Sequence, residues 1–454
     1  MYFVYLIHNQ LVKVQKKTSF LIIEKLRETI FSKELALTFK MNKQDFTRNR
    51  KQPFSSTLLF MFNLLRRSLA VEIDGFVRYL NERFSSGSTR SFTSSAFIQN
   101  RKKIDPEVFS HLSGVIIDNF YTPDNEALNY LNGIRVLAVD SSKLTLPCTV
   151  ELKKCYGVTK NQSQVEIVQA RASVLYDVLN GLTLDAVLDN LSKGERELAL
   201  RHAHRWKNKD LIIYDRGYPS YEFINEHIKR DVDCLIRVTT ASFSIAKNFI
   251  AGGKKSLITE IQPNNRHSFK GKDYHKDSFL KVRLLRVDLP GGEVEVLITT
   301  LLDSQRYPAK MFKKLYFLRW GVETFYDELK NKLKVEHFTG YSPVSIQQDF
   351  SCAIFISNLQ SVIVNDLADE LAIQNQGKQY DYKVNANLSY GFLKNRILEL
   401  LYRQAPLDKI FQELETLFLN HTVPIRNNRT IERHVGKFRA RTRPKVTKNQ
   451  RDAI

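Results

Sequence analysis

The spacing of apolar residues divides the chain into regions of different periodicity. From about residue 20 to residue 125, apolar positions recur at helical intervals, as in SFLIIEKLRETIF and STLLFMFNLLRRSLAVEIDGFVRYLN, and no convincing strand interrupts them. The pattern changes at GIRVLAVDSSKLTLP, residues 133–147, where a β-branched run predicts a buried strand that ends at Asp140 and passes into a polar turn. The pattern therefore predicts a helical N-terminal region followed by a sheet.

The sheet pattern continues to about residue 239. The stretch VEIVQARASVLYDVLNGLTLDAVLD predicts two strands joined at Asn180 and Gly181, because Asn-Gly is the strongest short hairpin signal. A helical stretch begins near Glu195, and LIIY then predicts a buried strand that ends at Asp215. A further helix and the strand DCLIRVT follow. Three strands, helix, strand, helix and strand predict an α/β fold with helices against a mixed sheet.

Two regions follow this core pattern. Residues 240–305 are rich in strand-forming sequence on either side of a Pro-Gly-Gly turn at 290–292, and they predict a β-rich insertion. Helical patterns resume at Ala309 and continue to about residue 420.

The charge balance makes nucleic acid the leading partner. A formal net charge of +21 attracts polyanions at long range. An anionic membrane surface is the competing interpretation, but no uninterrupted apolar run approaches the length of a spanning helix, so no membrane partner is expected. The opening MYFVYLIHNQLVK has no basic residues before its short apolar core, unlike a secretory signal, which favours the cytoplasm.

Basic residues gather at two places. One is KMNKQDFTRNRK, residues 40–51, and the other is a tail, residues 426–451, with ten Lys or Arg and one acid. The tail would neutralise DNA phosphates. In the N-terminal region, a helix pair around Asp105 and Pro106 is compatible with a DNA-groove motif and equally with plain helical packing.

Cysteine and histidine residues give no metal pattern. The four cysteines are scattered without CxxC pairs, which is typical of reduced thiols. His202 and His204 lie in a helical context, where side chains two residues apart point in different directions, so we expect both on the solvated surface.

The helix predicted for YFLRWGVETFYDELKNKL, residues 316–333, carries two stripes. On a continuous helix, an apolar stripe can pack on the sheet, and a second stripe holds Tyr316, Arg319, Glu323 and Lys330. An ordinary solvated i, i+4 pair of Arg319 and Glu323 is by itself the better interpretation of that stripe. Asp327 lies close to it, so geometry does not choose between Asp327 and Glu323.

Two aspartates at predicted strand ends change this interpretation. Asp140 and Asp215 end strands that can lie adjacent, and strand ends are where α/β sheets place their sites. Two such carboxylates with a third from a helix form an oxygen-rich site that suits Mg²⁺ or Mn²⁺. Two ions about 4 Å apart support phosphodiester chemistry.

These residues lie in segments that resemble a known family. LAVDSS, LIIYDRGYPS and YFLRWGVETFYDELK are similar to the three catalytic segments of bacterial insertion-sequence transposases of the DDE class, which have an RNase H-like core. The spacing Y-x2-R-x3-E-x6-K resembles the signature of the subgroup named for Tyr-Arg-Glu-Lys. Further similar segments are SAFIQNRKKIDPEVF, YDVLNGLTLDAVL and EHFTGYSPVSIQQDFSCAIFISNL, so the resemblance covers about residues 90–395.

The resemblance implies roles for individual residues. It implies that Asp140, Asp215 and Glu323 are the catalytic ligands of two Mg²⁺ ions, with Mn²⁺ as a substitute, and it selects Glu323 over Asp327. It also implies DNA contacts from Tyr316, Arg319, Lys330, Arg216 and Tyr218, with Gly217 serving the turn. In this subgroup the β insertion helps to hold the cleaved end, in some members with a Trp beside a flipped base. Residues 240–305 contain no Trp, and the question of a substitute stays open for Phe243, Phe269 and Tyr274.

The apolar pattern and the family resemblance together predict the domain organisation. We expect an N-terminal helical DNA-binding domain (1–125), the first part of the RNase H-like core (126–239), the β-rich insertion (240–305), the second part of the core with the Glu-bearing helix (306–395), and a C-terminal helical region with a basic tail (396–454).

The resemblance implies a transposase that acts on double-stranded DNA. It would bind the terminal inverted repeats of its insertion sequence as a homodimer on paired ends, cleave them through a hairpin intermediate, and join the 3′ ends to target DNA at the bacterial nucleoid. An RNase H-like nuclease without strand transfer is one alternative. A DNA-binding regulator that has lost activity is another, although a pure binder has no need of three converging acids.

Overall fold

The chain forms two compact units. The computed structural model describes residues 2–7, 10–15, 17–48, 51–63, 68–83, 91–160, 164–239, 243–264, 269–289, 293–402 and 405–426. The helical unit consists of Met1–Ile104, Lys330–Lys334 and Leu359–Ile454, and the core unit consists of Asp105–Leu329 and Val335–Asn358. The expected turn at 290–292 and the basic tail from residue 427 onward lie outside the described residues. The expected domain boundaries stay a prediction.

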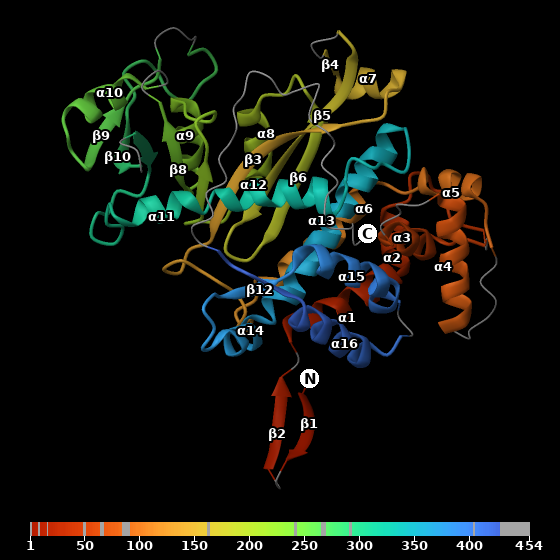
Figure 1. Cartoon of the computed structure of the whole chain (residues 1–454). Coiled ribbons are helices and arrows are strands. Elements are labelled where there is room, and N and C mark those ends of the chain that lie inside the picture. Colours follow the sequence, from red (N-terminus) through yellow and green to blue (C-terminus); the bar gives the residue numbers. More distant parts are fainter. Residues whose placement is uncertain are drawn as a thin grey trace, which may run out of the picture. The chain divides into compact units, whose positions relative to one another are not determined.

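The core unit is built around one mixed sheet (Figure 1). Its strands are β3 (Val136–Thr145), β4 (Val158–Lys160), β5 (Glu166–Asp177), β6 (Leu182–Asn190), β7 (Leu211–Tyr214), β8 (Asp233–Val238), β9 (Ser256–Ile261), β10 (Leu280–Asp288) and β11 (Val294–Thr299). Along the sheet the order is β6, β5, β3, β7, β8, β11, β10, β9, and β4 pairs with the start of β5. The antiparallel trio β3, β5 and β6 beside the parallel strands β7 and β8 has the topology of an RNase H-like core. The predicted fold class is confirmed.

Helices accompany this sheet in the core unit. They are α6 (Glu107–Phe120), α7 (Val150–Tyr156), α8 (Glu195–Arg201), α9 (Tyr221–Lys229), α10 (Ser244–Ala251), α11 (Met311–Phe317) and α12 (Trp320–Asp327), with a short 3₁₀ turn at His202–Arg205. Helix α13 (Pro343–Asn365) begins in the core unit, where the Asn358 side chain pairs with both backbone groups of Thr183 at 2.8 and 2.9 Å.

The predicted hairpin at Asn180 and Gly181 is confirmed as the β5–β6 connection. Gly181 has a φ of 69°, a left-handed conformation that glycine adopts without steric penalty. The carboxylate of Asp177 accepts hydrogen bonds from the backbone N–H groups of Leu179 and Asn180, at 2.9 and 3.0 Å. Local turn chemistry therefore determines the register of the two strands.

The predicted β-rich insertion extends the core sheet instead of forming a sheet of its own. Strand β11 pairs antiparallel with β8, for example Ile298 with Ile236, and β10 and β9 follow antiparallel. Consecutive side chains in the middle of β10, from Val282 to Leu285, are buried, so both faces of this part of the sheet are covered.

The predicted continuous helix over residues 316–333 is wrong. Helix α11 ends at Phe317, α12 begins at Trp320, and a π-helical segment occupies Glu328–Lys332. At the first break, the backbone N–H groups of Leu318 and Arg319 donate three residues back, at 3.2 and 3.1 Å. Because the number of residues per turn changes at both breaks, a uniform helical wheel does not place Lys330 on the stripe of Tyr316 and Glu323.

The helical unit joins the two ends of the described chain. Its elements are β1 (Tyr2–Ile7), β2 (Gln10–Gln15), α1 (Thr18–Ile30), α2 (Lys33–Thr38), α3 (Phe54–Phe62), α4 (Leu69–Arg83), α5 (Ser94–Arg101), α14 (Ala368–Asn375), β12 (Tyr382–Val384), α15 (Ala386–Leu401), α16 (Leu407–Asn420) and β13 (Thr422–Pro424). The buried guanidinium of Arg27 in α1 donates to the carbonyls of Leu400, Ala405 and Glu399 at 2.7–2.9 Å. Distant parts of the sequence therefore share this unit. The sequence pattern did not predict the β1–β2 hairpin.

One expectation about histidine is wrong. His202 is fully buried, and its ring nitrogens lie 2.6 Å from Oδ2 of Asp185 and 3.0 Å from Oγ of Ser173. The change from α8 to a 3₁₀ turn at His202 directs this ring toward the sheet strands. His204 is exposed, as expected.

Two observations concern the whole described chain. None of the four cysteines, which all lie in the described ranges, forms a disulfide, and Cys234 and Cys352 are buried. In the described ranges no single helix has the length and apolar character needed to cross a membrane, whereas α13 and α14 meet that criterion only as a pair bent by 53°.

Candidate active site

Asp140 lies where β3 loses its parallel neighbour. Strand β3 pairs with β7 only over Val136–Ala138, but it continues to Thr145 beside β5. The predicted strand end and polar turn after Asp140 are therefore wrong, because pairing with β5 satisfies the backbone of this polar segment. Asp140 still lies just past the last β3 residue that pairs with β7.

Asp215 directly follows β7, as predicted. Its Oδ1 accepts a hydrogen bond of 2.8 Å from the backbone N–H of Gly217. A Cβ atom added at Gly217 would lie 3.1 Å from that same oxygen, which is closer than side-chain contacts normally come. Glycine at this position therefore leaves room for the Asp215 carboxylate.

Helix α12 brings Glu323 toward Asp140 through Arg319. The Arg319 Nη2 lies 2.6 Å from Oε1 of Glu323, and its Nη1 lies 4.0 Å from Oδ2 of Asp140. Glu323 is thus linked to Asp140 through Arg319, whereas Asp327 occupies an exposed position of α12.

The helix is attached to the sheet beside this site. The hydroxyl of Tyr326 is 3.1 Å from the carbonyl oxygens of Asp140 and Ala172, which belong to β3 and β5. The ring of Phe325 stacks on Tyr176 with centroids 4.9 Å apart. These contacts hold α12 across β3 (Figure 1).

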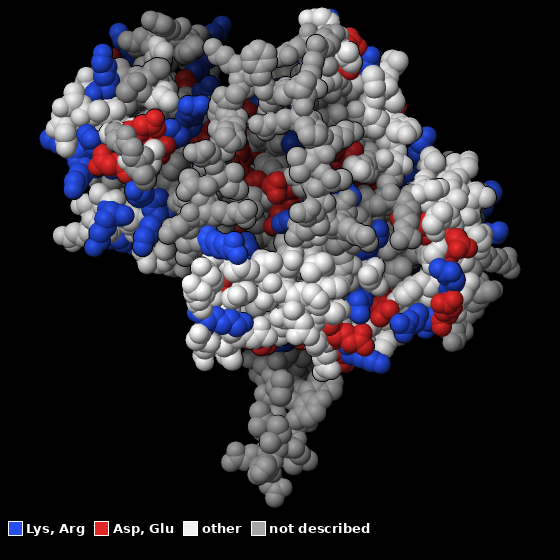
Figure 2. Space-filling model, in the orientation of Figure 1, with Lys and Arg blue, Asp and Glu red and all other residues white. Residues whose placement is uncertain are grey.

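Burial sets the electrostatics of Asp140. Loss of solvent raises the pKa of Asp140 to about 6; the hydrogen bond from the Ser141 N–H and the charge of Arg319 oppose this rise, and the carboxylates of Asp215 and Glu323 add to it. All three predicted acids therefore contribute to one electrostatic environment. In Figure 2, acidic side chains of the core unit gather in a recess over α12.

The three acids fit a divalent cation by donor type. Carboxylate oxygens are the ligands that Mg²⁺ and Mn²⁺ prefer. In the described part of the chain, however, no three acidic, histidine or cysteine side chains converge as a metal site. The guanidinium of Arg319 provides positive charge between Asp140 and Glu323 in this conformation.

The predicted DNA-contacting residues differ in exposure. Arg216 is exposed, whereas Tyr218 is fully buried, with its ring 5.0 Å from that of Tyr214. Tyr316 is 9% exposed, burial raises its pKa to about 12, and the Arg319 guanidinium lies 5.7 Å from the centre of its ring. Lys330 belongs to the helical unit, so the structure does not place it relative to these residues.

Arg319 has a free donor in spite of its contacts. Its side chain is 9% exposed, and the buried Nε has no hydrogen-bond partner in the described part of the chain. A buried donor of this kind is available to an incoming acceptor such as a phosphate oxygen.

Of the aromatic residues considered for the insertion, Tyr274 is the most constrained. It is 9% exposed, its ring lies 5.0 Å from that of Tyr221, and its hydroxyl donates to Glu222 at 3.0 Å. Its ring also packs edge-on with Phe269 at 6.1 Å. Figure 2 shows Lys and Arg side chains gathered over α10 and β9–β11 in the same region.

Sequence reasoning missed Glu195 at the start of α8. Its Oε2 would lie 3.3 Å from a Cβ added at Gly217, so Glu195 and Asp215 face the same glycine. Nη1 of Arg171 donates to Oε1 of Glu195 at 2.9 Å. An acidic residue in a first helical turn is ordinary because it complements the helix dipole, so the sequence carried no signal for this position.

Comparison with known proteins gives three findings. Residues 131–359, just over half of the 454-residue chain, match the family model described as a transposase DDE domain. The transposase InsG for insertion sequence element IS4 of Escherichia coli (strain K12) is 23% identical over 248 residues, which are 53% of this chain and 54% of that relative. The chain thus spans about half the length of this relative.

The third finding concerns a solved structure. The cryo-EM structure of the piggyBac transposase synaptic complex with hairpin DNA has a TM-score of 0.42 and 9% sequence identity, and the match covers 88% of this chain and 81% of that one. A likeness this distant does not identify a shared site.

Proposed function

We propose a function from one premise: the chain belongs to the transposase DDE domain family. We propose that it is a transposase and that it binds the inverted repeats of its own insertion sequence. It would cleave the DNA through a hairpin intermediate and transfer the 3′ ends to target DNA. The convergence of Asp140 and Glu323 on Arg319, with Asp215 acting on the same Asp140 carboxyl, is the observation that carries this proposal.

The acids would hold the divalent cations of the reaction. Asp140, Asp215 and Glu323 supply oxygen ligands from two strands and one helix. When bound, Mg²⁺ or Mn²⁺ supplies activation of the attacking oxygen and stabilisation of the leaving one in phosphodiester chemistry. Burial raises the pKa of Asp140, so a nearby positive charge would stabilise the ionised form of this carboxyl group.

Arg319 would hold DNA beside those acids. Its Nε donor is unpartnered among the described residues, and a guanidinium binds phosphate oxygens with charge-assisted hydrogen bonds. Binding of a cation by Glu323 would replace the charge of Arg319 and free its Nη2 for a phosphate. The basic surface over α10 and β9–β11 would extend the DNA contact.

Partners and location follow from this activity. Pairing two element ends requires two catalytic units, so we propose a homodimer on DNA. Because the proposed reaction uses chromosomal DNA, we propose that the protein acts at the bacterial nucleoid.

The test uses the full chain and a duplex copied from the DNA that flanks its gene. With Mg²⁺, we expect wild type to cut at the element end and to join that end to a target plasmid. Glu323→Gln should lower cleavage at least about 100-fold, because a direct ligand contributes more than the 10- to 100-fold of the groups that orient it.

The control is Asp327→Asn on the same helix, which should cleave as wild type does. Equal cleavage by Glu323→Gln and wild type would refute the assignment of the acids. Cleavage without a joined product would favour a nuclease, and specific binding without cleavage would favour a regulator.

A further inference from the structure

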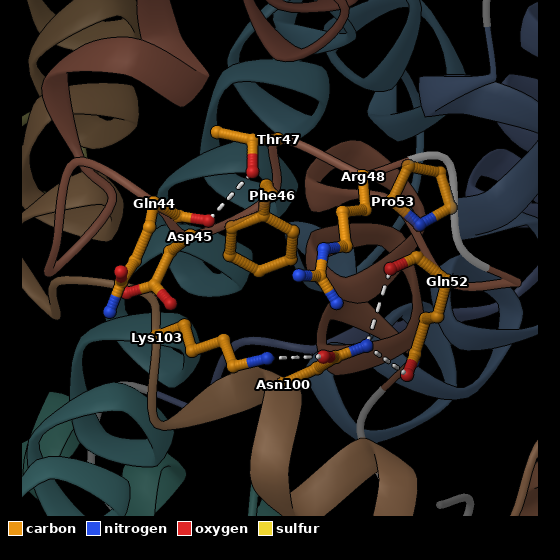
Figure 3. A pocket seen from close by; sticks show the side chains of 9 residues that line it. All are labelled: Gln44, Asp45, Phe46, Thr47, Arg48, Gln52, Pro53, Asn100 and Lys103. Carbon is orange, nitrogen blue, oxygen red and sulfur yellow. Dashed lines mark hydrogen bonds between the residues drawn. The ribbon is translucent and has the colours of Figure 1, made fainter.

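Residues 44–48, in the described part of the basic segment 40–51, line a cavity that is separate from the candidate active site. Residues 40–48 lie against the end of α5, where the backbone N–H of Met41 donates to the carbonyl of Lys103 at 2.9 Å and Lys40 bridges to Ile104. Between them is a cavity of about 580 Å³ within the helical unit (Figure 3). Its lining consists of Gln44, Asp45, Phe46, Thr47, Arg48, Gln52, Pro53, Asn100 and Lys103.

Two cations of this cavity are available to an anion. Arg48 is exposed and forms no ion pair within the described ranges, and Nζ of Lys103 makes only a 3.4 Å hydrogen bond to Oδ1 of Asn100. The one acid of the lining, Asp45, accepts from the backbone and side chain of Asn42 at 3.0 and 3.1 Å. The carboxylate is thus held in its own turn, and the cavity presents positive charge.

A buried amide adds a hydrogen-bond donor. Gln52 is 3% exposed, and its Nε2 is buried with no partner among the described residues. Its Oε1 and backbone oxygen already accept from Nδ2 of Asn100, both at 3.2 Å. Because buried donors are almost always paired, the free Nε2 indicates a position for an acceptor atom of a ligand.

An aromatic ring completes the lining in an unusual backbone conformation. Phe46 has a φ of 55°, a left-handed conformation that a bulky residue rarely adopts and that marks strain. Its half-buried ring packs edge-on with Phe54, centroids 5.3 Å apart. Figure 3 shows this ring beside the Arg48 side chain and facing the same opening as Asn100 and Lys103. The ring offers a stacking surface next to donors and cations.

We propose that this cavity binds one unpaired nucleotide of DNA. The base would stack on Phe46, the Nε2 of Gln52 would donate to a base acceptor, and Arg48 and Lys103 would hold the phosphate. Aromatic stacking combined with cationic backbone contacts is how proteins hold unpaired nucleotides. The choice of DNA over a free nucleotide rests on the proposed function, whereas the nucleotide chemistry rests on the cavity itself.

The test measures binding without cleavage. In the full chain carrying Glu323→Gln and without metal, fluorescence anisotropy compares a 30-base-pair duplex that has one unpaired thymine with its fully paired counterpart. We expect the bulged duplex to bind about tenfold more tightly, in keeping with the stacking of one base. Arg48→Ala and Lys103→Ala should weaken binding of both duplexes, and Phe46→Leu should remove only the preference for the bulge.

Matched controls make the outcome decisive. Lys102→Ala changes an exposed lysine beside Lys103 that does not line the cavity, so it should have less effect than Lys103→Ala. Phe46→Tyr keeps a ring and should keep the preference, which separates stacking from misfolding of Phe46→Leu.

Three results would overturn the proposal. One is equal binding of the two duplexes by the parent chain, which would mean that the cavity contacts phosphate at most and holds no unpaired base. Another is equal effects of Lys103→Ala and Lys102→Ala. The third is competition by free thymidine monophosphate at the affinity of the bulged duplex, which would assign the cavity to a small molecule. None of these results bears on metal-dependent cleavage by wild type, so failure of the cavity and failure of the proposed function are distinguishable.

Discussion

At the scale of single residues, the candidate site depends on contacts among a few charged side chains. Arg319 contacts Glu323 of α12 and approaches Asp140 of β3, so its positive charge lies close to both carboxylates. Glu195 brings a fourth carboxylate toward Asp215 from α8, and Arg171 holds it there. We therefore infer that Glu195, held by Arg171, is a positioning residue for the loop that carries Asp215.

A substitution at Glu195 tests this role. Glu195→Gln keeps the shape but weakens the attraction of Arg171, and we expect cleavage to fall about 10- to 100-fold, the range typical of groups that orient ligands. The concentration of Mg²⁺ needed for half-maximal cleavage should rise as well, which a purely structural role would not produce.

The control for this prediction is Glu197→Gln. Glu197 lies in the same helix but pairs with Lys193 on the surface at 2.9 Å, and such exposed pairs contribute little. A Glu195→Gln variant with wild-type metal dependence would show that the residue takes no part in the site.

At the scale of elements, the position of α12 decides the site. The chain between α11 and α12 tightens at residues 318 and 319, and Glu328–Lys332 is π-helical, so the Glu-bearing segment is short and has a break on both sides. Its attachment to the sheet depends on Tyr326, whose hydroxyl reaches β3 and β5. Breaks of this kind often occur at functional sites.

Removing that hydroxyl should loosen the element. Tyr326→Phe loses its hydrogen bonding to two carbonyl oxygens in a buried position, and we expect the free energy of unfolding to fall by about 1–2 kcal/mol. Urea denaturation measures this change. Cleavage should fall too, because Glu323 is carried by the same helix.

Tyr341→Phe is the matched control for Tyr326→Phe. Tyr341 is 68% exposed in the core unit, and loss of its hydroxyl should change the free energy of unfolding by less than about 0.5 kcal/mol. Equal stabilities of the two variants would contradict the role given to Tyr326.

At the scale of the whole molecule, net charge would govern the proposed encounter with DNA. The net charge of +21 includes ten Lys or Arg in the segment 426–451. Each phosphate that a protein neutralises on duplex DNA contributes about 0.9 to the slope of log affinity against log salt. The tail therefore sets a ceiling of about 9 on its own contribution to that slope.

Removing the positive charges of the tail measures how much the tail contributes to the salt dependence of DNA binding. With all ten basic residues of 426–451 changed to Gln, chain length is kept, and we expect a salt dependence shallower by several units in a titration from 50 to 200 mM salt. The parent chain under the same salt titration is the reference. An unchanged slope would mean that the tail does not contact phosphates.

Local features of this protein were predictable from residue patterns. The Asn180-Gly181 turn, the strand LIIY before Asp215 and the strand-rich insertion were predictable, because turn residues and apolar runs act over a few positions. The spacing of Tyr316, Arg319, Glu323 and Lys330 also indicated the family, which the match over residues 131–359 established.

Features that depend on contacts between distant segments became visible in the folded chain alone. The continuation of β3 past Asp140 depends on β5, the burial of His202 depends on Asp185 and Ser173, and the approach of Glu195 to Asp215 depends on α8 and the β7 loop. The union of α1 with α15 and α16 likewise joins segments more than 350 residues apart. A linear pattern records the polarity of each side chain, but its partners are set by how the whole chain packs.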